Sequence, residues 1–323
     1  MKRLLLICLM RFLVCLTGGC GTQEPVNNSV QEKVAYEVID EAGRKLTFTE
    51  KPQRIASLTY GTDEILTDLV GTKRIVGYSR WAGDPEITFI TKEQARKVGR
   101  KLEENTEAVL SVKPDLVVAT TASNNEIIHS LEALGLKVYL AGRPKNYEQM
   151  RVKVLKLGEA VGEKAKGEEL VKQMDERIAK LESKLCKIPD DKRKTVVAFN
   201  FISAMGRKGD LIDNMLNMAH INNGVAQIPN EFMTSYVSKE QVVRINPDIF
   251  LLPTWNYDNR QDIEGYLNRV QNDPAYKDVK AIKNNQIKFV SDKYRYVASH
   301  HIVDAVENFA KAVYPEYFRG EKS

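Results

Sequence analysis

The chain has 323 residues, of which 43% are hydrophobic and 28% charged, and its formal net charge at pH 7 is +5. This length allows two substantial cores, and the composition is that of a soluble globular protein. The net charge is small for the length, and Lys and Glu are mixed along most of the chain. We therefore expect no nucleic-acid partner, whereas an anionic small ligand is compatible with this charge.

Residues 1–19 have the pattern of a secretory signal peptide. Lys2 and Arg3 precede a short apolar stretch, which ends in Gly18 and Gly19 directly before Cys20. Small residues before a cysteine resemble the lipobox of bacterial lipoproteins, which implies that Cys20 is lipidated and becomes the new N-terminus. The alternative is cleavage without an anchor. Because no other stretch approaches the ~18 to 20 apolar residues of a membrane-spanning helix, we expect membrane attachment through this lipid only.

Cysteine usage limits the chemistry of the mature chain. Cys8, Cys15 and Cys20 lie at the N-terminus, so Cys186 alone remains in the body of the protein. One cysteine can form no intramolecular disulfide and cannot by itself hold a zinc or iron–sulfur site. Residues 20–33 are polar without an apolar period and are interpreted as a flexible tether.

Residues 34–161 predict an N-terminal α/β lobe. It begins with a hairpin around Ala42 and Gly43, after which short apolar strands alternate with helices of about ten residues, the pattern of parallel βαβ units. The expected strands are 54–58, 75–78, 116–119 and 137–140, and the expected helices include 62–70 and 124–134.

Residues 162–187 predict one long helix between two lobes. Its apolar residues are spaced by three or four positions and form one stripe: Leu170, Met174, Ile178, Leu181 and Leu185. At 1.5 Å per residue such a helix is roughly 35 Å long, enough to reach from one lobe to another.

Residues 188–323 repeat the plan of the first half. Strands are expected at 195–199, 249–252 and 286–290, with helices at 213–219, from 239, at 262–272 and at 301–313, and each half contains an apolar strand introduced by Pro-Asp. The fold class predicted is therefore α/β, with two Rossmann-like lobes with parallel sheets, joined by one long α-helix, and a ligand cleft between the lobes.

Four blocks of sequence resemble the solute-binding proteins of ABC importers for ferric siderophores, heme and cobalamin. The blocks are RIASLTYGTDEILTDLVG, VGRKLEENTEAVLSVKPDLVVA, YVSKEQVVRINPDIFLL and IVDAVENFAKAVYPEYF, and together they extend from Arg54 to Phe318. The resemblance implies a monomer that captures its ligand outside the cytoplasm, moves its lobes little on binding, and delivers the ligand to the transmembrane subunits of an ABC permease. That family often has Pro-Ser where this chain has Thr59-Tyr60-Gly61, which leaves the identity of the ligand open.

The resemblance also implies two docking glutamates, one per lobe, that meet arginines of the permease. They fall on Glu64 and Glu240, each in the first turn of an expected helix. The alternative is that both only stabilise the positive end of their helix.

Ligands of parallel α/β lobes bind at the carboxyl ends of the strands. Aromatic faces there suit a planar or catecholate ligand, and arginines pair with anionic groups. The candidate ligand residues are Tyr60, Arg80, Trp81, Thr121, Arg143, Asn200, Trp255, Tyr257, Tyr294 and Arg295. Core packing or loop anchoring is the alternative for each aromatic, and it is preferred for Phe199 and Tyr296.

Other functional classes lack their sequence patterns. The chain contains no Gly-x-Ser-x-Gly, Gly-x-Gly-x-x-Gly or Walker loop, so we expect no enzyme, no catalytic residue and no cofactor. No metal ligand is assigned. His300 and His301 open the last helix, and a metal role for them is the less favoured alternative. The expected function is capture of a ferric siderophore or heme. A corrinoid is the first alternative, and a molybdate-type oxyanion, which arginines and backbone amides would bind, is the second.

Overall fold

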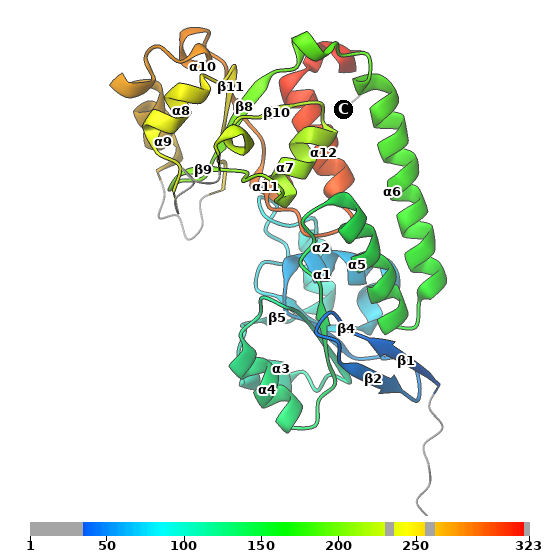
Figure 1. Ribbon diagram of the computed structural model, residues 1–323. Coiled ribbons are helices and arrows are strands. Elements are labelled where there is room, and N and C mark those ends of the chain that lie inside the picture. Colours follow the sequence, from blue (N-terminus) through cyan, green and yellow to red (C-terminus); the bar gives the residue numbers. More distant parts are fainter. Residues whose placement is uncertain (1–34, 230–235, 256–261, 320–323) are drawn as a thin grey trace, which may run out of the picture. The chain divides into compact units, whose positions relative to one another are not determined.

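The computed structural model describes residues 35–229, 236–255 and 262–319 (Figure 1). The expected signal peptide (1–19), the tether (20–33) with Cys20, and Tyr257 lie outside the described residues. The first described element is the expected hairpin, in which β1 (Tyr36–Ile39) pairs antiparallel with β2 (Lys45–Phe48). Gly43 lies in its turn with φ of 76°, a conformation that glycine adopts without strain.

The first lobe is built on a five-stranded parallel sheet with the order β5-β4-β3-β6-β7. Three of its strands are buried along almost their whole length (55–57, 116–120 and 138–141), as expected where helices cover both faces of a parallel sheet. The strands are β3 (Ile55–Ser57), β4 (Ile75–Ser79), β5 (Lys101–Leu102), β6 (Leu116–Thr120) and β7 (Val138–Ala141), and the helices are α1 (Tyr60–Val70), α2 (Lys92–Val98), α3 (Thr106–Ser111), α4 (Asn125–Ala133) and α5 (Tyr147–Ala160).

The second lobe is built on a sheet with the order β10-β8-β11-β12, in which β9 also pairs with β8. The path strands are parallel, as predicted, but β9 is antiparallel. The strands are β8 (Thr195–Phe199), β9 (Ala204–Met205), β10 (Asn222–Asn223), β11 (Ile249–Leu252) and β12 (Ile287–Phe289), and the helices are α7 (Leu211–Met218), α8 (Lys239–Ile245), α9 (Ile263–Gln271), α10 (Lys280–Lys283), α11 (Asp292–Arg295) and α12 (Ile302–Val313).

The antiparallel β9 arises from a short turn that sequence analysis did not predict. The Asn200 side chain accepts hydrogen bonds from the backbone N–H groups of Ile202 and Ser203, and this arrangement folds the chain back on itself. Short 3₁₀ helices occupy further connections, at Thr72–Arg74, Asp190–Lys192, Val225–Gln227, Pro274–Tyr276 and Pro315–Phe318.

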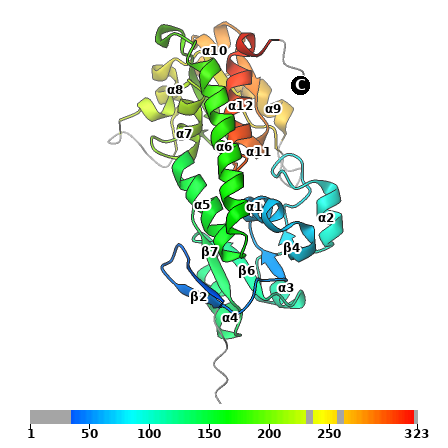
Figure 2. The ribbon, with the colours of Figure 1, turned by 90° about the vertical axis from the view of Figure 1, so that its right-hand side faces the viewer.

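The predicted long helix is α6 (Lys164–Leu185), and Figure 2 shows it running alongside elements of both lobes. Met174, Leu181 and Leu185 are buried as expected, together with Val171. The helix packs on α5 of the first lobe and on α12 of the second, so one apolar cluster includes residues of both lobes. The predicted α/β class with two lobes is thereby confirmed. Within the described ranges, no helix is both long and apolar enough to cross a bilayer.

The lobes also touch directly, where the first turn of α1 meets the segment before α12. A Cβ added to Gly61 would lie 2.5 Å from the carbonyl oxygen of Ala298 and 2.7 Å from its Cβ. Because a carbonyl oxygen and a Cβ cannot swing aside as the end of a long side chain can, only glycine permits this approach of the lobes.

We expect Gly61→Ala to destabilise the protein by about 1–3 kcal/mol, since the new methyl group must push the segment at Ala298 away. Urea unfolding measures the change. The matched control is Gly167→Ala in α6, where a Cβ would come no closer than 3.4 Å to its neighbours and stability should be unchanged or higher by roughly 0.5–1 kcal/mol. Equal stability of the two variants would show that the lobes do not approach this closely.

Candidate ligand-binding site

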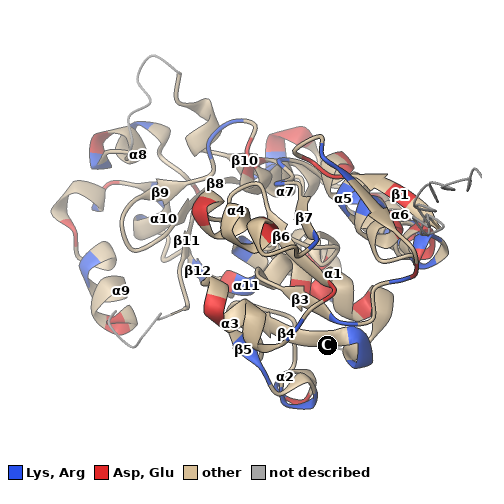
Figure 3. Cartoon of the chain, turned by 90° about the horizontal axis from the view of Figure 1, so that it is seen from below, with Lys and Arg blue, Asp and Glu red and all other residues tan. Residues whose placement is uncertain are grey.

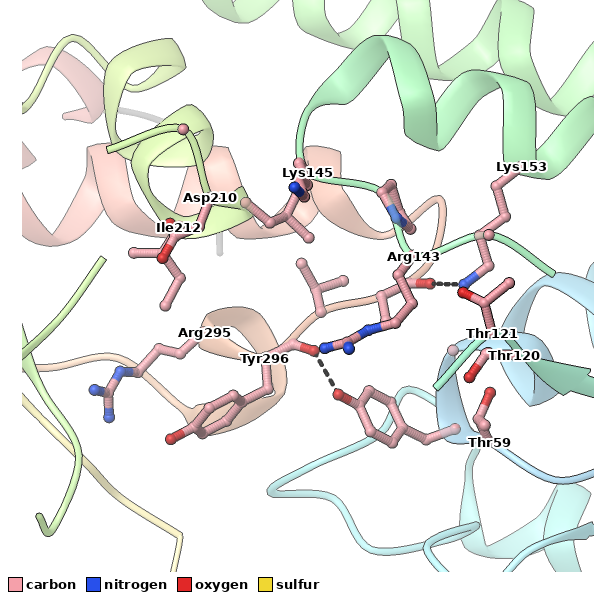
Figure 4. Close-up of a pocket in the computed structure, with 18 of the residues that line it drawn as sticks. Thr59, Thr120, Thr121, Arg143, Lys145, Lys153, Asp210, Ile212, Arg295 and Tyr296 are labelled. Carbon is pink, nitrogen blue, oxygen red and sulfur yellow. Dashed lines mark hydrogen bonds between the residues drawn. The ribbon is translucent and has the colours of Figure 1, made fainter. Parts of the chain in front are cut away.

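A cavity of about 850 Å³ lies between the lobes (Figure 4). The first lobe lines it with residues at the carboxyl ends of β3, β6 and β7, and the second lobe with the segments before α7 and before α12. The lining residues are Thr59, Tyr60, Gly61, Thr120, Thr121, Gly142, Arg143, Pro144, Lys145, Lys153, Lys208, Gly209, Asp210, Leu211, Ile212, Arg295, Tyr296, Val297 and Ala298. The volume lies in the upper range of small-molecule sites, which span roughly 300–1,000 Å³.

The lining is strongly basic. Among the described residues it contains five cationic side chains, Arg143, Lys145, Lys153, Lys208 and Arg295, against the single carboxylate of Asp210. Asp210 serves mainly as the N-cap of α7, because its Oδ1 accepts the N–H of Asp213 at 2.8 Å. A concave site with such an excess of positive charge attracts anions.

Lys153 is buried in α5, only 4% exposed, and its Nζ donates a hydrogen bond to the carbonyl oxygen of Ala298 at 2.8 Å. Burial lowers its pKa to about 8, although the charge of Glu64 opposes that shift. Sequence reasoning missed this residue. The available signal is a lysine on the apolar stripe of a helix, between Met150 and Leu157, both fully buried.

Arg295 lines the cavity but its guanidinium is engaged inside the second lobe. It is 1% exposed, its Nη1 lies 2.9 Å from Oδ1 of Asp292, and its Nη2 donates to the carbonyl oxygen of Phe199. Asp292 also accepts the backbone N–H groups of Thr254 and Trp255, at 2.8 and 2.7 Å. Figure 4 shows the guanidinium directed away from Arg143. Arg295 therefore anchors the loops of its lobe.

Tyr60 connects the lobes at the cavity wall. Its hydroxyl donates to the carbonyl oxygen of Tyr296 at 2.8 Å, and burial raises its pKa to about 12. Tyr296, which sequence analysis assigned to packing, is itself a lining residue. Of the ten candidate ligand residues, the structure brings together Tyr60, Thr121, Arg143 and Arg295 around the cavity.

The two tryptophans do not line this cavity, contrary to expectation. Trp81 and Trp255 come from different lobes and pack edge to face, with ring centroids 5.3 Å apart. Nε1 of Trp255 donates to Asp84 at 3.1 Å, and the guanidinium of Arg80 lies 4.3 Å from the ring of Trp81. The expected ligand loops meet each other here and form an inter-lobe contact.

Two further candidates are not among the cavity-lining residues. Tyr294 packs edge to face against Phe89, with ring centroids 5.4 Å apart. The Asn200 side chain accepts the hydrogen bonds of the turn before β9, and its backbone N–H donates to the carbonyl oxygen of Ser203.

The expectation that Glu64 is exposed for docking is wrong. Glu64 is 3% exposed, and its carboxylate accepts hydrogen bonds from the Thr88 hydroxyl at 2.7 Å, the Phe89 N–H at 2.9 Å and the Ser299 hydroxyl. The Thr88–Phe89 segment of the first lobe and Ser299 of the second lobe together cover it, so its carboxylate cannot reach a protein partner.

Glu240 is exposed in the first turn of α8, and the first lobe repeats its surroundings at Glu107 in α3. Each glutamate is the second residue after the N-cap of its helix, and each stands the same number of residues before a Pro-Asp pair. The aspartate of each pair, Asp115 or Asp248, accepts backbone N–H groups at the start of the neighbouring strand. Glu107 is thus the first-lobe counterpart of Glu240, and Figure 1 shows α3 and α8 on the side of their lobes away from α6.

An α/β protein with two lobes and a charged cavity between them has the form of a solute-binding protein. Residues 55–294 match the family described as periplasmic binding protein, and the chain belongs to this family.

Named relatives differ in what they bind. The probable siderophore-binding lipoprotein YfiY of Bacillus subtilis is 24% identical over 327 residues, which cover 95% of this chain and 98% of that protein. The Fe(3+)-citrate-binding protein YfmC of the same organism is 24% identical over 301 residues, covering 88% of this chain and 89% of that protein. The structure of MolA of Haemophilus influenzae bound to molybdate has a TM-score of 0.68 and 22% identity, and the match covers 88% of this chain and 93% of that one.

We expect the buried Lys153 to give stability a distinctive pH dependence. Below pH 8 this lysine is charged in both the folded and the unfolded state, so its burial cost is fully present. Between pH 8 and 10.5 the unfolded chain binds more protons, so stability rises with pH. The difference between the pKa of Lys153 in the folded state, about 8, and its ordinary value of 10.5 corresponds to roughly 3 kcal/mol in the free energy of unfolding.

The measurement is urea unfolding of the wild type and Lys153→Met from pH 7 to 10.5. The difference in stability between them should shift in favour of the wild type as pH rises. Lys172→Met, on the exposed face of α6, is the control and should keep a constant difference. A pH-independent difference for Lys153→Met would contradict the burial of a charged ammonium group.

Proposed function

We propose that this protein captures an anionic ferric chelate and delivers it to an ABC permease. The observation that carries the proposal is the cavity of about 850 Å³ lined by Arg143, Lys145, Lys153 and Lys208, in addition to Arg295, whose charge is paired with Asp292. An iron complex with several carboxylate or other anionic oxygens fits both the size and the charge of this cavity. The names of the two Bacillus relatives, for a siderophore and for ferric citrate, support the same class.

The alternatives fit this cavity less well. Heme and corrinoids are large planar ligands for which aromatic side chains are suited, but the described lining offers only Tyr60 and Tyr296. Molybdate carries the right charge but is far smaller than the cavity. Heme carries two carboxylates that the cationic side chains can bind, so heme is the second candidate.

Several further properties belong to the same proposal. We infer a binding protein without catalysis or resident cofactor, because the family is one of substrate-binding transport proteins. The N-terminal pattern and the lipoprotein name of a relative support lipidation of Cys20 and an extracytoplasmic location. That the protein is a monomer is proposed from the family resemblance alone. Figure 3 shows Lys and Arg mixed with Asp and Glu over the lobes, which supports the expectation of no nucleic-acid partner.

Arg143→Ala should weaken binding of the chelate about ten- to a hundredfold, because a hydrogen bond to a charged group contributes roughly 1.5–3 kcal/mol. Arg143 is exposed within the cavity and is not tied to a partner in the way that Arg295 is. Isothermal titration with ferric citrate, a ferric siderophore, hemin, cyanocobalamin and molybdate measures the effect. Arg96→Ala, on α2 outside the cavity, is the control and should bind as the wild type does. Binding of cyanocobalamin or molybdate without any ferric chelate would refute the proposal.

We propose Glu107 and Glu240 as the docking pair in place of Glu64. Reversing both charges, with Glu107→Lys and Glu240→Lys together, should abolish cellular uptake of the ligand and leave its affinity unchanged, because exposed charges at an interface steer and orient association. Uptake of radiolabelled iron chelate and titration of the purified protein measure the two properties. Glu93→Lys is the matched control, since Glu93 is also the second residue after an N-cap, that of α2. Equal loss of uptake in this control, or loss of ligand affinity in the pair, would contradict the assignment.

A further inference from the structure

Three potential metal ligands meet at a second junction of the lobes, outside the cavity lining. Asp68 lies in the last turn of α1, and His300 and His301 directly precede α12. One ligand atom from each of the three lies within 4.8 Å of the others, and Nε2 of His300 is 2.9 Å from Oδ2 of Asp68. The cluster therefore joins the first lobe to the second.

The ring of His301 is held in a defined orientation. Its Nδ1 is 2.7 Å from Oδ2 of Asp304, and the other oxygen of Asp304 accepts a hydrogen bond from Arg177 of α6 at 2.7 Å. The imidazole also stacks on Phe89, with ring centroids 3.9 Å apart and 9° between the planes. A carboxylate on one ring nitrogen fixes the tautomer and leaves the other nitrogen as a lone-pair donor, which is the usual arrangement around histidines that bind metals.

His300 is 6% exposed, and its Nδ1 is buried with no hydrogen-bond partner among the described residues. Among the described residues, Nε2 of His300 is paired with Asp68, whose side chain is 50% exposed. Solvent and an incoming ion can therefore reach the cluster from the side of Asp68. An ion pair with Asp68 accounts for His300, but it does not account for the placement of a third donor, on a braced ring, beside them.

We propose that Asp68, His300 and His301 bind one divalent first-row transition-metal ion, with Zn²⁺ as the probe, and that solvent completes its coordination. Two imidazole nitrogens, one carboxylate oxygen and an open position form a set that suits Zn²⁺ and its neighbours. Tetrahedral bonds of about 2.0–2.1 Å place donor atoms about 3.3 Å apart. Asp68 and His300, at 2.9 Å, need to separate by a few tenths of an ångström, and the ligand atom of His301, which lies within 4.8 Å of theirs, must approach by up to about 1.5 Å. This inference departs from the expectation, from sequence, of no metal ligand.

The ion would bridge the lobes and hold them together independently of the captured ligand. It is a different site from the cavity, because none of its three ligands is among the cavity-lining residues. Its role is to set how readily the lobes separate, and its occupancy would follow the supply of the metal outside the cell.

Chelator-treated full-length protein is titrated with Zn²⁺ against a chromophoric competitor. The wild type should bind one equivalent tightly, and His301→Ala and Asp68→Asn should each lose more affinity than Asp304→Asn, for which about a ten- to hundredfold loss is expected because it removes only the group that orients His301. His129→Ala, on the exposed face of α4, and His220→Ala, whose ring pairs with Glu182, are controls and should keep the wild-type affinity. Unchanged Zn²⁺ affinity in both His301→Ala and Asp68→Asn would overturn the proposal.

Thermal unfolding and Co²⁺ absorption provide independent readouts. Zn²⁺ should raise the Tm of the wild type in a concentration-dependent way, because it binds only the folded state, and should leave the Tm of His301→Ala unchanged. Co²⁺ should give visible absorption bands with the wild type that His301→Ala lacks. Ferric-chelate affinity should be equal in both proteins, which separates this site from the proposed function. An equal rise in Tm for wild type and variant would refute the bridge.

Discussion

The arrangement of the lobes depends on the contact between the Tyr296–Ser299 segment of the second lobe and helices α1 and α5 of the first. Four interactions fall within these few residues: the Tyr60 hydroxyl on the carbonyl of Tyr296, the Lys153 ammonium on that of Ala298, Gly61 against Ala298, and the Ser299 hydroxyl on Glu64. Lys153, Glu64 and Ser299 are buried and the other groups are partly buried, and a buried polar group without a partner costs free energy. Separation of the lobes would therefore expose or orphan several groups at once.

The same contact positions one of the cations of the cavity. Lys153 is held at the cavity wall by a carbonyl oxygen of the other lobe, and the nearby Glu64 is itself occupied by hydrogen bonds. Burying an ammonium group lowers its pKa, so this cation reduces stability while it adds positive charge to the site. A stability cost of this kind, retained in a cavity wall, is typical of residues kept for binding.

Much of the fold could be predicted because its signals are local. Apolar runs introduced by Pro-Asp predicted β6 and β11, and the spacing of Met174, Leu181 and Leu185 predicted α6. The β9 hairpin was missed because it depends on one asparagine side chain that folds back on its own turn. Within the lobes, then, sequence periodicity was a sufficient guide.

The candidate site was predicted less completely because its geometry is decided between lobes. Tyr60, Thr121 and Arg143 could be found since they follow strands directly. The position of Glu64 near a helix start predicts exposure, but a segment 235 residues further along the chain contributes to its burial. Likewise, nothing in the loops of Trp81 and Trp255 indicates that the two rings would contact each other across the lobes.

That last contact has an optical consequence. The chain contains only two tryptophans, one contributed by each lobe, and their rings are 5.3 Å apart. Two indoles at such a distance exchange excitation energy and couple their near-ultraviolet transitions, and both effects fall steeply with separation. The intrinsic fluorescence emission and the near-ultraviolet circular dichroism of the unlabelled protein therefore report on the distance between the lobes.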